Sequence, residues 1–237
     1  MIEKNLGGFV IAATGLAAEA RIAERAAGVH AVVGGGDAER LASELRKSIT
    51  KGGRAIISFG IAGGLQSSLR PGECLVGRRV FAGNQLFDAD AAWTARICAL
   101  VPDITQADIA GVTAPVANRQ QKAALHIETR AAVADMESGT VARIAAEHGL
   151  PFAVVRVVAD TADRDLPPAA LIELNRDGTP NIRAVLTSLL VQPTQLPALA
   201  GVGLDAGRAM RRLLRCHRAL GARLGFTDLD QLVFDVA

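Results

Sequence analysis

The sequence has 237 residues, of which 50% are hydrophobic and 21% charged, and its formal net charge is +2. This length and apolar content suit a single domain with a sizeable core, here expected over residues 1–237. The near-neutral charge argues against a nucleic-acid binder, which would carry a basic stripe. Aromatic residues make up only 3%, so base-stacking surfaces for single-stranded nucleic acid are not evident.

The cysteines and histidines do not form a metal-binding pattern. The three cysteines lie far apart without CxxC spacing, which is typical of reduced thiols in a cytosolic protein. The four histidines lack the spacing of metalloenzyme motifs. No signal peptide and no apolar stretch long enough to span a bilayer is recognised. We therefore expect a cytoplasmic protein with no metal site.

Short apolar runs alternate with helical patterns along the chain. Strands are expected at residues 9–14, 29–33, 55–59, 74–81, 107–112, 131–136 and 152–158. Helices are expected at residues 16–27, 38–50 (capped by Asp37), 91–100, 118–126, 138–148 and about 199–224. Beyond residues 167–168 the chain is expected to be helical except around 177–180, and a helical tail starts at about residue 181. The alternation predicts an α/β fold with a mostly parallel sheet covered on both faces.

Ligands of open α/β sheets bind at the carboxyl ends of the strands, so residues that follow the apolar runs are the candidates for a site. One candidate is the glycine-rich segment at residues 60–65, which is expected to form a loop after the strand at residues 55–59. Glycines there would let backbone amides approach a ligand closely. The segment is neither a dinucleotide-binding motif nor a Walker loop, and a plain tight turn explains it equally well.

Acidic residues follow other predicted elements. Asp135 and Glu137 stand at a strand-to-helix junction, where they either accept hydrogen bonds from sugar hydroxyls or favour the start of the helix. Asp160 follows a buried strand, where desolvation would raise its pKa and suit it to acid catalysis; an N-cap or turn role is the alternative. Arg156 inside that strand needs an ionic partner, and we expect Asp135 or Glu137. Glu19 by itself indicates only a surface helix acid.

Five segments carry a resemblance to a known family: residues 58–65, 69–73, 87–90, 135–138 and 151–160. Each is loose alone, but their order and spacing are specific. Together they resemble the superfamily of purine nucleoside phosphorylases and methylthioadenosine/S-adenosylhomocysteine nucleosidases over most of the chain. The resemblance implies a three-layer αβα fold with a mixed, mostly parallel central sheet. It also implies an oligomeric enzyme that cleaves the N-glycosidic bond of an adenosine-type nucleoside.

Within that superfamily the chain looks most like the hopanoid-associated phosphorylase branch. The pointers are residues 14–16 with 19–21, residues 166–168 and the helical tail. Members of that branch are thought to release adenine from adenosylhopane, a nucleoside-tailed triterpenoid, during hopanoid side-chain biosynthesis. A lipid-linked substrate implies a peripheral contact with the inner membrane. The arginine-rich last helix and the apolar region at residues 196–204 are candidates for it.

The resemblance also implies roles for individual residues. Asp160 resembles the acid that protonates purine N7, and Glu19 the acid that orients or deprotonates the attacking water. Glu137 resembles the residue that binds the ribose hydroxyls, with Met136 packing against the sugar. The other residues assigned to substrate binding are Gly60, Ile61, Ala62, Gly63, Asp135, Arg21 and Val116. No metal or organic cofactor is implied, and phosphate is the one potential co-substrate.

The chain departs from the family pattern at three places. Ala159 replaces the serine that precedes the final aspartate in nucleosidases, so a hydroxyl that could orient the acid is missing. Ser58 and Ile61 stand where phosphorylases place an arginine and a serine for phosphate, which leaves Arg21 or another arginine to supply that contact. Residues 113–116 hold no aromatic side chain for the adenine.

These departures leave several alternatives open. The nucleophile is phosphate or water. The substrate is adenosylhopane or, alternatively, methylthioadenosine or S-adenosylhomocysteine. A nucleoside-binding regulator without catalysis is a rival from another class, and so is a structural or adaptor protein, since fold does not fix function.

Overall fold

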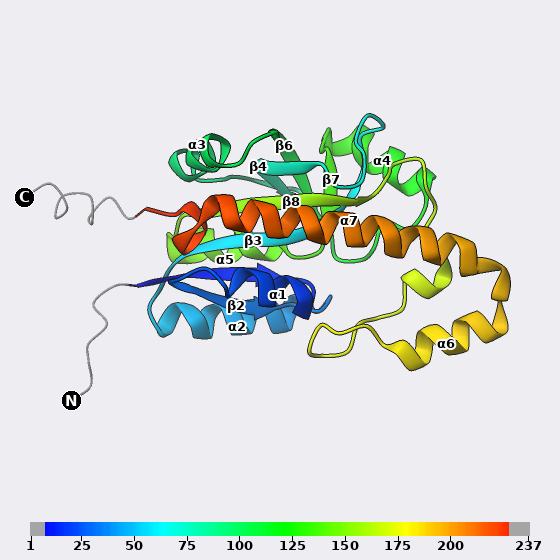
Figure 1. Ribbon diagram of the computed structural model, residues 1–237. Coiled ribbons are helices and arrows are strands. Elements are labelled where there is room, and N and C mark those ends of the chain that lie inside the picture. Colours follow the sequence, from blue (N-terminus) through cyan, green and yellow to red (C-terminus); the bar gives the residue numbers. More distant parts are fainter. Residues whose placement is uncertain (1–7, 228–237) are drawn as a thin grey trace, which may run out of the picture.

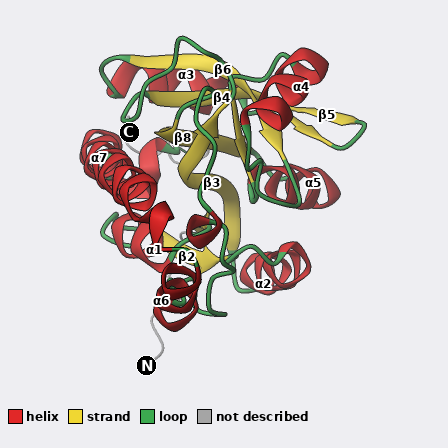
Figure 2. Ribbon diagram, turned by 90° about the vertical axis from the view of Figure 1, so that its right-hand side faces the viewer, coloured by secondary structure: helices red, strands yellow, loops and turns green. Residues whose placement is uncertain are grey.

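The computed structural model describes residues 8–227 and contains one eight-stranded mixed sheet with helices on both sides (Figures 1 and 2). The strands are β1 (Phe9–Thr14), β2 (Val29–Val33), β3 (Gly53–Gly64), β4 (Cys74–Ala82), β5 (Gln85–Asp88), β6 (Ile104–Gly111), β7 (Val133–Asp135) and β8 (Phe152–Asp160). The helices are α1 (Ala17–Ala23), α2 (Ala38–Thr50), α3 (Ala91–Leu100), α4 (Arg119–Thr129), α5 (Ser138–His148), α6 (Ile182–Val191) and α7 (Leu196–Leu220). Short 3₁₀ turns lie at Pro168–Ala170, Pro193–Gln195 and Ala222–Gly225.

The sheet closes on itself through five of its strands. β8 pairs with both β3 and β4, β4 pairs with β6, and β7 joins β6 back to β3. β1 and β2 extend the sheet beyond β3, and β5 extends it beyond β4. Five of the eight strand pairings are parallel and three are antiparallel. The predicted mixed, mostly parallel sheet is therefore confirmed.

Two apolar cores hold the layers together, one on each face of the sheet. Figure 2 shows α1 and α7 on one side of the strands and α2 and α5 on the other. Alternate residues of one strand enter opposite cores: Ile57 packs with α1 and α7, whereas Ile56 packs with α2 and α5. Since both faces of β8 are covered, every residue of this strand is buried, as near-continuous apolar runs in α/β sheets predict.

Two strands run further than the sequence predicts. The segment from Gly60 to Gly64 was expected to be a loop, and this prediction is wrong because β3 continues through it to pair with β8 and then with β7. β8 likewise continues beyond Val158 to Asp160. The longer strands carry their terminal residues to one edge of the sheet, so the candidate site is built on strand backbone.

The C-terminal third is less helical than the sequence predicts, although α6 begins close to residue 181, where the helical tail was expected. After Pro167 only one 3₁₀ turn forms, and residues 171–181 are irregular before α6 begins at Ile182. The last long helix begins at Leu196, three residues before the predicted start, and ends at Leu220, four residues before the predicted end. The ends of the domain predicted over residues 1–237 lie outside the described residues.

Within residues 8–227, no single helix is both long and apolar enough to cross a bilayer. The pair formed by Ile182–Val191 and Pro193–Leu220 satisfies length and composition only when taken together, and it bends by 114° at the break.

The first turn of α5 lies directly on the end of β6 because both positions at the contact are glycine. A Cβ placed on Gly111 would lie 2.4 Å from the backbone nitrogen of Gly139 and 2.6 Å from its Cα. Backbone atoms cannot move aside as a flexible side chain can. This contact fixes the helix start next to which Glu137 stands.

We predict that Gly111→Ala lowers the free energy of unfolding by about 1–3 kcal/mol through overpacking, measured by urea denaturation. Gly203→Ala is the matched control, because Gly203 lies in α7 with nothing within 4 Å of its added Cβ. That control should be neutral or more stable, since glycine costs a helix about 1 kcal/mol relative to alanine. Equal stability of the two variants would contradict the tight contact.

Candidate active site

Four strands deliver the candidate residues to one edge of the sheet. β1, β3 and β8 are parallel neighbours, so their carboxyl ends meet on the same side, and the short β7 pairs with the last two residues of β3. Figure 1 shows this edge at the end of the molecule opposite the two termini, beside α6 and the first turns of α7. The helices α1 and α5 begin at this edge, directly after β1 and β7.

Glu19 is buried in this edge, in contrast to the surface acid that its position alone indicates. Its side chain is 1% exposed. Oε2 accepts hydrogen bonds from the amides of Gly15 (2.9 Å) and Leu16 (2.8 Å), and Oε1 accepts from the amide of Ile61 at 2.7 Å. Burial raises the pKa of Glu19, against the opposing effect of Arg156 and of these amide hydrogen bonds. The carboxylate thus ties the start of α1 to β3.

Arg156 is the central cation of the site, and it is fully buried in the middle of β8. Its Nε donates to Asp135 Oδ2 at 3.0 Å, and its Nη2 donates to Glu137 Oε2 at 3.3 Å and to Ser58 Oγ. The sequence left Asp135 and Glu137 as alternative partners, and the structure pairs Arg156 with both. A buried guanidinium is tolerated only with such partners.

The side chain of Asp135 accepts its hydrogen bonds from the protein's own backbone and side chains. Its Oδ1 accepts from the amides of Glu137 (2.9 Å) and Ser138 (2.7 Å), and its Oδ2 accepts from Ser138 Oγ at 2.6 Å as well as from Arg156. The carboxylate therefore caps the first turn of α5, a position that the helix dipole favours. Each of the two oxygens thus accepts two hydrogen bonds, so the geometry gives Asp135 a role in holding the site rather than in contacting a substrate directly.

Glu137 stands where the chain turns from β7 into α5, next to the backbone of β1. A Cβ on Gly15 would lie only 2.7 Å from Glu137 Oε1, so glycine is needed for this approach. Burial raises the pKa of Glu137 to about 7; Arg156 opposes the rise, whereas Asp135 and Glu19 add to it. Near neutral pH, part of the Glu137 population is therefore protonated.

Asp160 ends β8, and its partner was not predicted. Lys122 from α4 donates to Asp160 Oδ2, and the same Nζ donates to the carbonyls of Thr161 (2.7 Å) and Arg164 (2.9 Å). Both side chains of the pair are buried. Burial raises the pKa of Asp160, and Lys122 is the main opposing influence. No sequence pattern indicates Lys122, because α4 is otherwise mostly exposed.

The glycine-rich end of β3 lies between these acids. A Cβ on Gly60 would lie 2.5 Å from Arg156 Nη1 and 2.6 Å from Glu19 Oε1, and one on Gly63 would lie 3.3 Å from Asp160 Oδ1. Ile61 contributes its amide to Glu19, and Ala62 between them is buried in the core on the α5 side. The glycines therefore allow Arg156, Glu19 and Asp160 to pack closely against the backbone of β3. This role differs from that of the turn glycines that the sequence indicates.

The remaining predicted residues are less closely connected to the cluster. Met136 is half-buried between Asp135 and Glu137, with its Cε 3.6 Å from the Cβ position of Gly36. Val116 packs against a small apolar cluster that includes Leu65. Arg21 is exposed on α1, and it follows the inward-facing Glu19 by two residues, which places it on another side of the helix. The structure does not bring Arg21 to the carboxylates.

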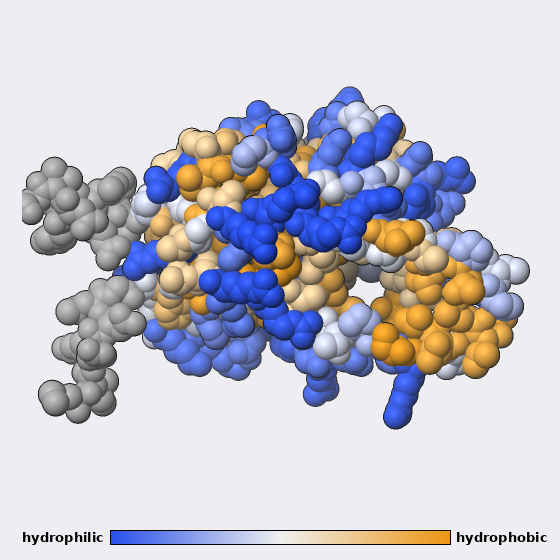
Figure 3. Space-filling model, in the orientation of Figure 1, coloured by the Kyte–Doolittle hydropathy of each residue, from blue (hydrophilic) through white to orange (hydrophobic). Residues whose placement is uncertain are grey.

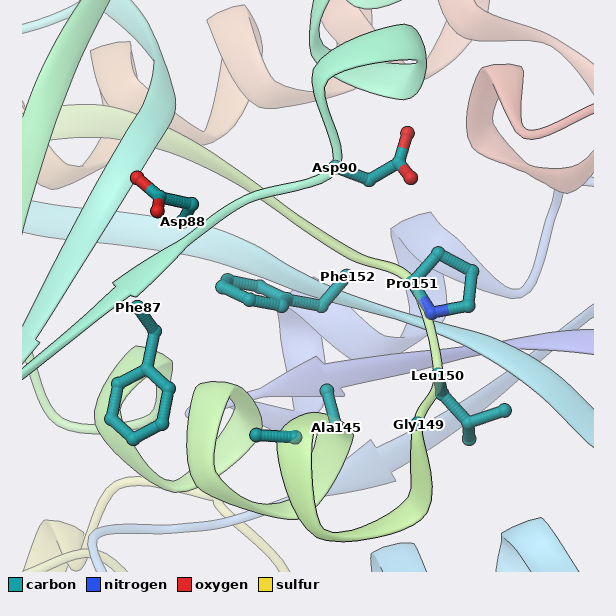
Figure 4. Close-up of a pocket in the computed structure, with 9 residues that line it drawn as sticks. Phe87, Asp88, Asp90, Ala145, Gly149, Leu150, Pro151 and Phe152 are labelled. Atoms are coloured by element: carbon teal, nitrogen blue, oxygen red, sulfur yellow. The ribbon is translucent and has the colours of Figure 1, made fainter.

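A separate cavity of about 250 Å³ lies at the opposite end of β8. Figure 4 shows its walls, which come from the last turn of α5, the Pro151–Phe152 step and the Phe87–Asp90 segment. Phe152 begins β8 and Asp160 ends it, so about 26 Å of strand separate the cavity from the carboxylates. Among residues 8–227 no group of three or more histidine, cysteine or acidic residues is arranged to hold a metal ion.

Sequence comparison places this arrangement in a family. Residues 10–191, about three quarters of the chain, match the model of the Phosphorylase superfamily. The chain belongs to the phosphorylase superfamily. Membership confirms the predicted superfamily and the prediction of an enzyme of the nucleoside phosphorylase/nucleosidase class. None of the curated proteins matches the sequence.

Solved structures of low sequence identity share the fold of this phosphorylase-superfamily protein. A Helicobacter pylori methylthioadenosine nucleosidase variant holding 5'-methylthioadenosine matches with a TM-score of 0.63 at 14% identity, covering 89% of this chain and 98% of its own. A Helicobacter pylori futalosine hydrolase variant matches at 0.60 and 15%, covering 78% and 100%. The S. pneumoniae methylthioadenosine/S-adenosylhomocysteine nucleosidase matches at 0.58 and 14%, covering 89% and 99%. The predicted fold class is confirmed by these likenesses.

We predict that Arg156→Met lowers the free energy of unfolding by about 3–5 kcal/mol, because it leaves two buried carboxylates without their cation. Urea denaturation at pH 7 measures the change. The control is Arg46→Met, which breaks the ion pair between Arg46 and Glu147 (2.7 Å), whose side chains are 48% and 50% exposed. An exposed pair contributes at most about 1 kcal/mol. Similar losses in both variants would show that the cluster does not depend on Arg156.

Proposed function

We propose that this protein cleaves the N-glycosidic bond of an adenosine-type nucleoside and releases the purine base. The observation that carries the proposal is the gathering of Glu19, Glu137 and Asp160 at one edge of the sheet, all less than 10% exposed. Cleavage builds positive charge on the ribosyl ring and negative charge on the base. Carboxylates stabilise the first, and a proton neutralises the second.

Asp160 supplies that proton to purine N7 in this proposal. Its pKa is raised by burial, which keeps more of the group protonated near neutral pH than an exposed aspartate would be. The Oδ1 atom lies against Gly63, where the absence of a side chain leaves room for a flat base. Glu137 accepts hydrogen bonds from the ribose hydroxyls, and Met136 packs against the sugar.

Water is the nucleophile that this arrangement favours. Arg156 is the cation among the carboxylates, and its donors are already engaged by Asp135, Glu137 and Ser58. A phosphate dianion would therefore meet several buried acids without a free cation, which is electrostatically unfavourable. Glu19 is held by three amides, of which only one, that of Ile61, donates to Oε1. Oε1 therefore retains a lone pair with which it accepts a proton from the attacking water. Phosphorolysis is the competing reaction.

Asp160→Asn should lower adenine release by about 10²–10⁴-fold, the usual contribution of a general acid. The assay follows adenine from methylthioadenosine and from adenosylhopane, each with and without phosphate. Asp163→Asn is the control, because Asp163 is exposed and bonds to Thr161, and it should retain full activity. Release that requires phosphate would contradict the hydrolytic route, and equal rates in both variants would contradict the role of Asp160.

We further propose that the substrate carries an apolar tail, as adenosylhopane does, and that the enzyme meets it at a lipid surface. An apolar patch supports this step. It lies at the end of the molecule where the strands carry the site (Figures 1 and 3). Its members share exposed fractions of 55–84%, and they are Ile182, Leu186, Leu190, Val191, Leu196 and Leu204.

The position of α6 supports a surface role for this patch. α6 buries no residue of its own and contacts mainly the two 3₁₀ turns beside it, so its apolar stripe at i, i+4 and i+8 faces outward. Exposed apolar patches of this kind mark interaction sites. The exposed arginines along α7, such as Arg208 and Arg211, complement anionic headgroups. The loop before α6 is tied to the active-site edge, since Ala17 N donates to Gly178 O at 3.1 Å.

Leu190→Glu should reduce kcat/KM for adenosylhopane in anionic vesicles by about tenfold or more, the loss expected for one leucine no longer buried. Its kcat/KM for methylthioadenosine should not change, because that nucleoside has no tail. The control is Ile127→Glu on α4, which replaces another exposed apolar residue (68%) outside the patch. Equal losses on both substrates, or vesicle binding unaffected by Leu190→Glu, would contradict the lipid-facing role.

Methylthioadenosine or S-adenosylhomocysteine is the second candidate substrate. The observation that favours it is the likeness to nucleosidases named for these compounds. The same assay separates the two, since a tail-dependent enzyme has a much lower kcat/KM for methylthioadenosine. The presence of all three acids argues against a regulator that binds nucleosides without cleaving them.

A further inference from the structure

Lys122 is a buried charge with a defined set of partners. Its side chain is 1% exposed although it belongs to α4, whose other residues are mostly exposed. An ammonium group has three N–H donors and no acceptor. Each donor has a partner: Asp160 Oδ2, the carbonyl of Thr161 and the carbonyl of Arg164. The lysine therefore has a fixed position relative to the segment that follows β8.

This contact distinguishes the two oxygens of Asp160. Oδ2 is taken by Lys122, whereas no residue among those described hydrogen-bonds to Oδ1, which lies beside Gly63 at the glycine-rich end of β3. Since Lys122 donates to Oδ2, and the carbonyl oxygen of a carboxylic acid is a better acceptor than its hydroxyl oxygen, a protonated Asp160 favours its proton on Oδ1. The preceding residue is Ala159, which has no hydroxyl that could hydrogen-bond to the Asp160 carboxyl and orient it.

We propose that Lys122 is the positioning residue of the acid, which fixes the proton of Asp160 on Oδ1, directs it toward the base, and stabilises the carboxylate that remains. The proposal rests on the proposed function. In the step, the Oδ1 proton passes to purine N7 as the C1'–N9 bond breaks and its electron pair goes to the base. Asp160 becomes a carboxylate that still accepts from Lys122. Water attacks C1' and gives its proton to Glu19.

Two other charged groups face Asp160 and also influence its pKa. Arg164 from the loop after β8 favours the carboxylate, and Asp205 from α7 disfavours it. These two residues pair with each other, so their effects partly cancel. Lys122 therefore dominates the charge environment of Asp160 apart from burial itself.

The test compares Lys122→Met, Lys122→Arg and the control Arg119→Met for adenine release across pH 5–10. Arg119 lies on the same helix but pairs with Asp165 at the surface, so its variant should match the wild type. Lys122→Met should lower kcat about 10–100-fold, which is less than the roughly 10²–10⁴-fold contribution of a general acid, because Asp160 remains but is no longer positioned. Its alkaline limb of kcat/KM should move to higher pH, because the cation that favours the carboxylate is gone. Lys122→Arg should keep the wild-type limb and recover part of kcat.

A lower kcat in Lys122→Met with an unmoved alkaline limb would overturn the proposal, since a purely structural lysine predicts that result. A carboxyl ¹³C NMR titration of Asp160, assigned with Asp160→Asn, gives a readout that does not need turnover. It should show a higher pKa for Asp160 in Lys122→Met than in the wild type, and an unchanged value would also overturn the proposal. Failure of the wild type to release adenine would count against the proposed function, whereas the titration still decides the coupling of Lys122 to Asp160. If Lys122→Met does not fold, Lys122→Gln replaces it with the same expected directions.

Discussion

The pairing of Arg156 with its carboxylates is the constraint on which the site depends. A guanidinium in the middle of a fully buried strand has a large desolvation cost, and it is stable there only because Asp135, Glu137 and Ser58 accept its hydrogen bonds. Asp135 in turn caps α5, and α5 lies against β6 at Gly111. One cation therefore links the centre of the sheet, the start of a helix and the acid assigned to the ribose.

Arg156 lowers the pKa values of Glu19 and Glu137, but this effect does not outweigh that of burial. Glu19 and Glu137 both have raised pKa values because burial outweighs the attraction of Arg156. Asp160 lies three β3 residues further along, beside Gly63, and has its own cation in Lys122. The site is thus divided into two ion clusters. In the proposed reaction, the first cluster faces the sugar and its developing positive charge, and the second transfers a proton to the base.

Much of the fold could be predicted from the sequence, because local signals were consistent with it. Asp37 caps α2 through the amide of Arg40, and Gly149 ends α5 with a left-handed φ of 61°. The strand ends could not be predicted in the same way, since Gly60–Gly64 is a strand only through pairing with β8 and β7. Local composition carries no information about such partners, so the segment had the features of a loop.

The candidate site could be predicted only in part, because sequence patterns indicate single residues more readily than their distant partners. Resemblance indicated Glu19, Glu137 and Asp160, and the pairing of Arg156 followed from the rule that buried charges need partners. Lys122 could not be found, because its partner lies 38 residues away and its helix is otherwise exposed. Arg21 was chosen by its position in the chain, and only the helical geometry shows that it faces away from Glu19.

β8 is synthesised after both of the strands between which it lies, and this order has a consequence for the folding chain. β8, the last strand among the described residues, lies between β3 and β4, so a chain emerging from the ribosome holds two unpaired interior edges until residue 160 has been made. Unpaired edges with apolar side chains are prone to wrong pairing with other chains. The same late strand carries Arg156 and Asp160. Completion of the sheet and assembly of the site therefore both require β8, and chains that end before this strand hold neither.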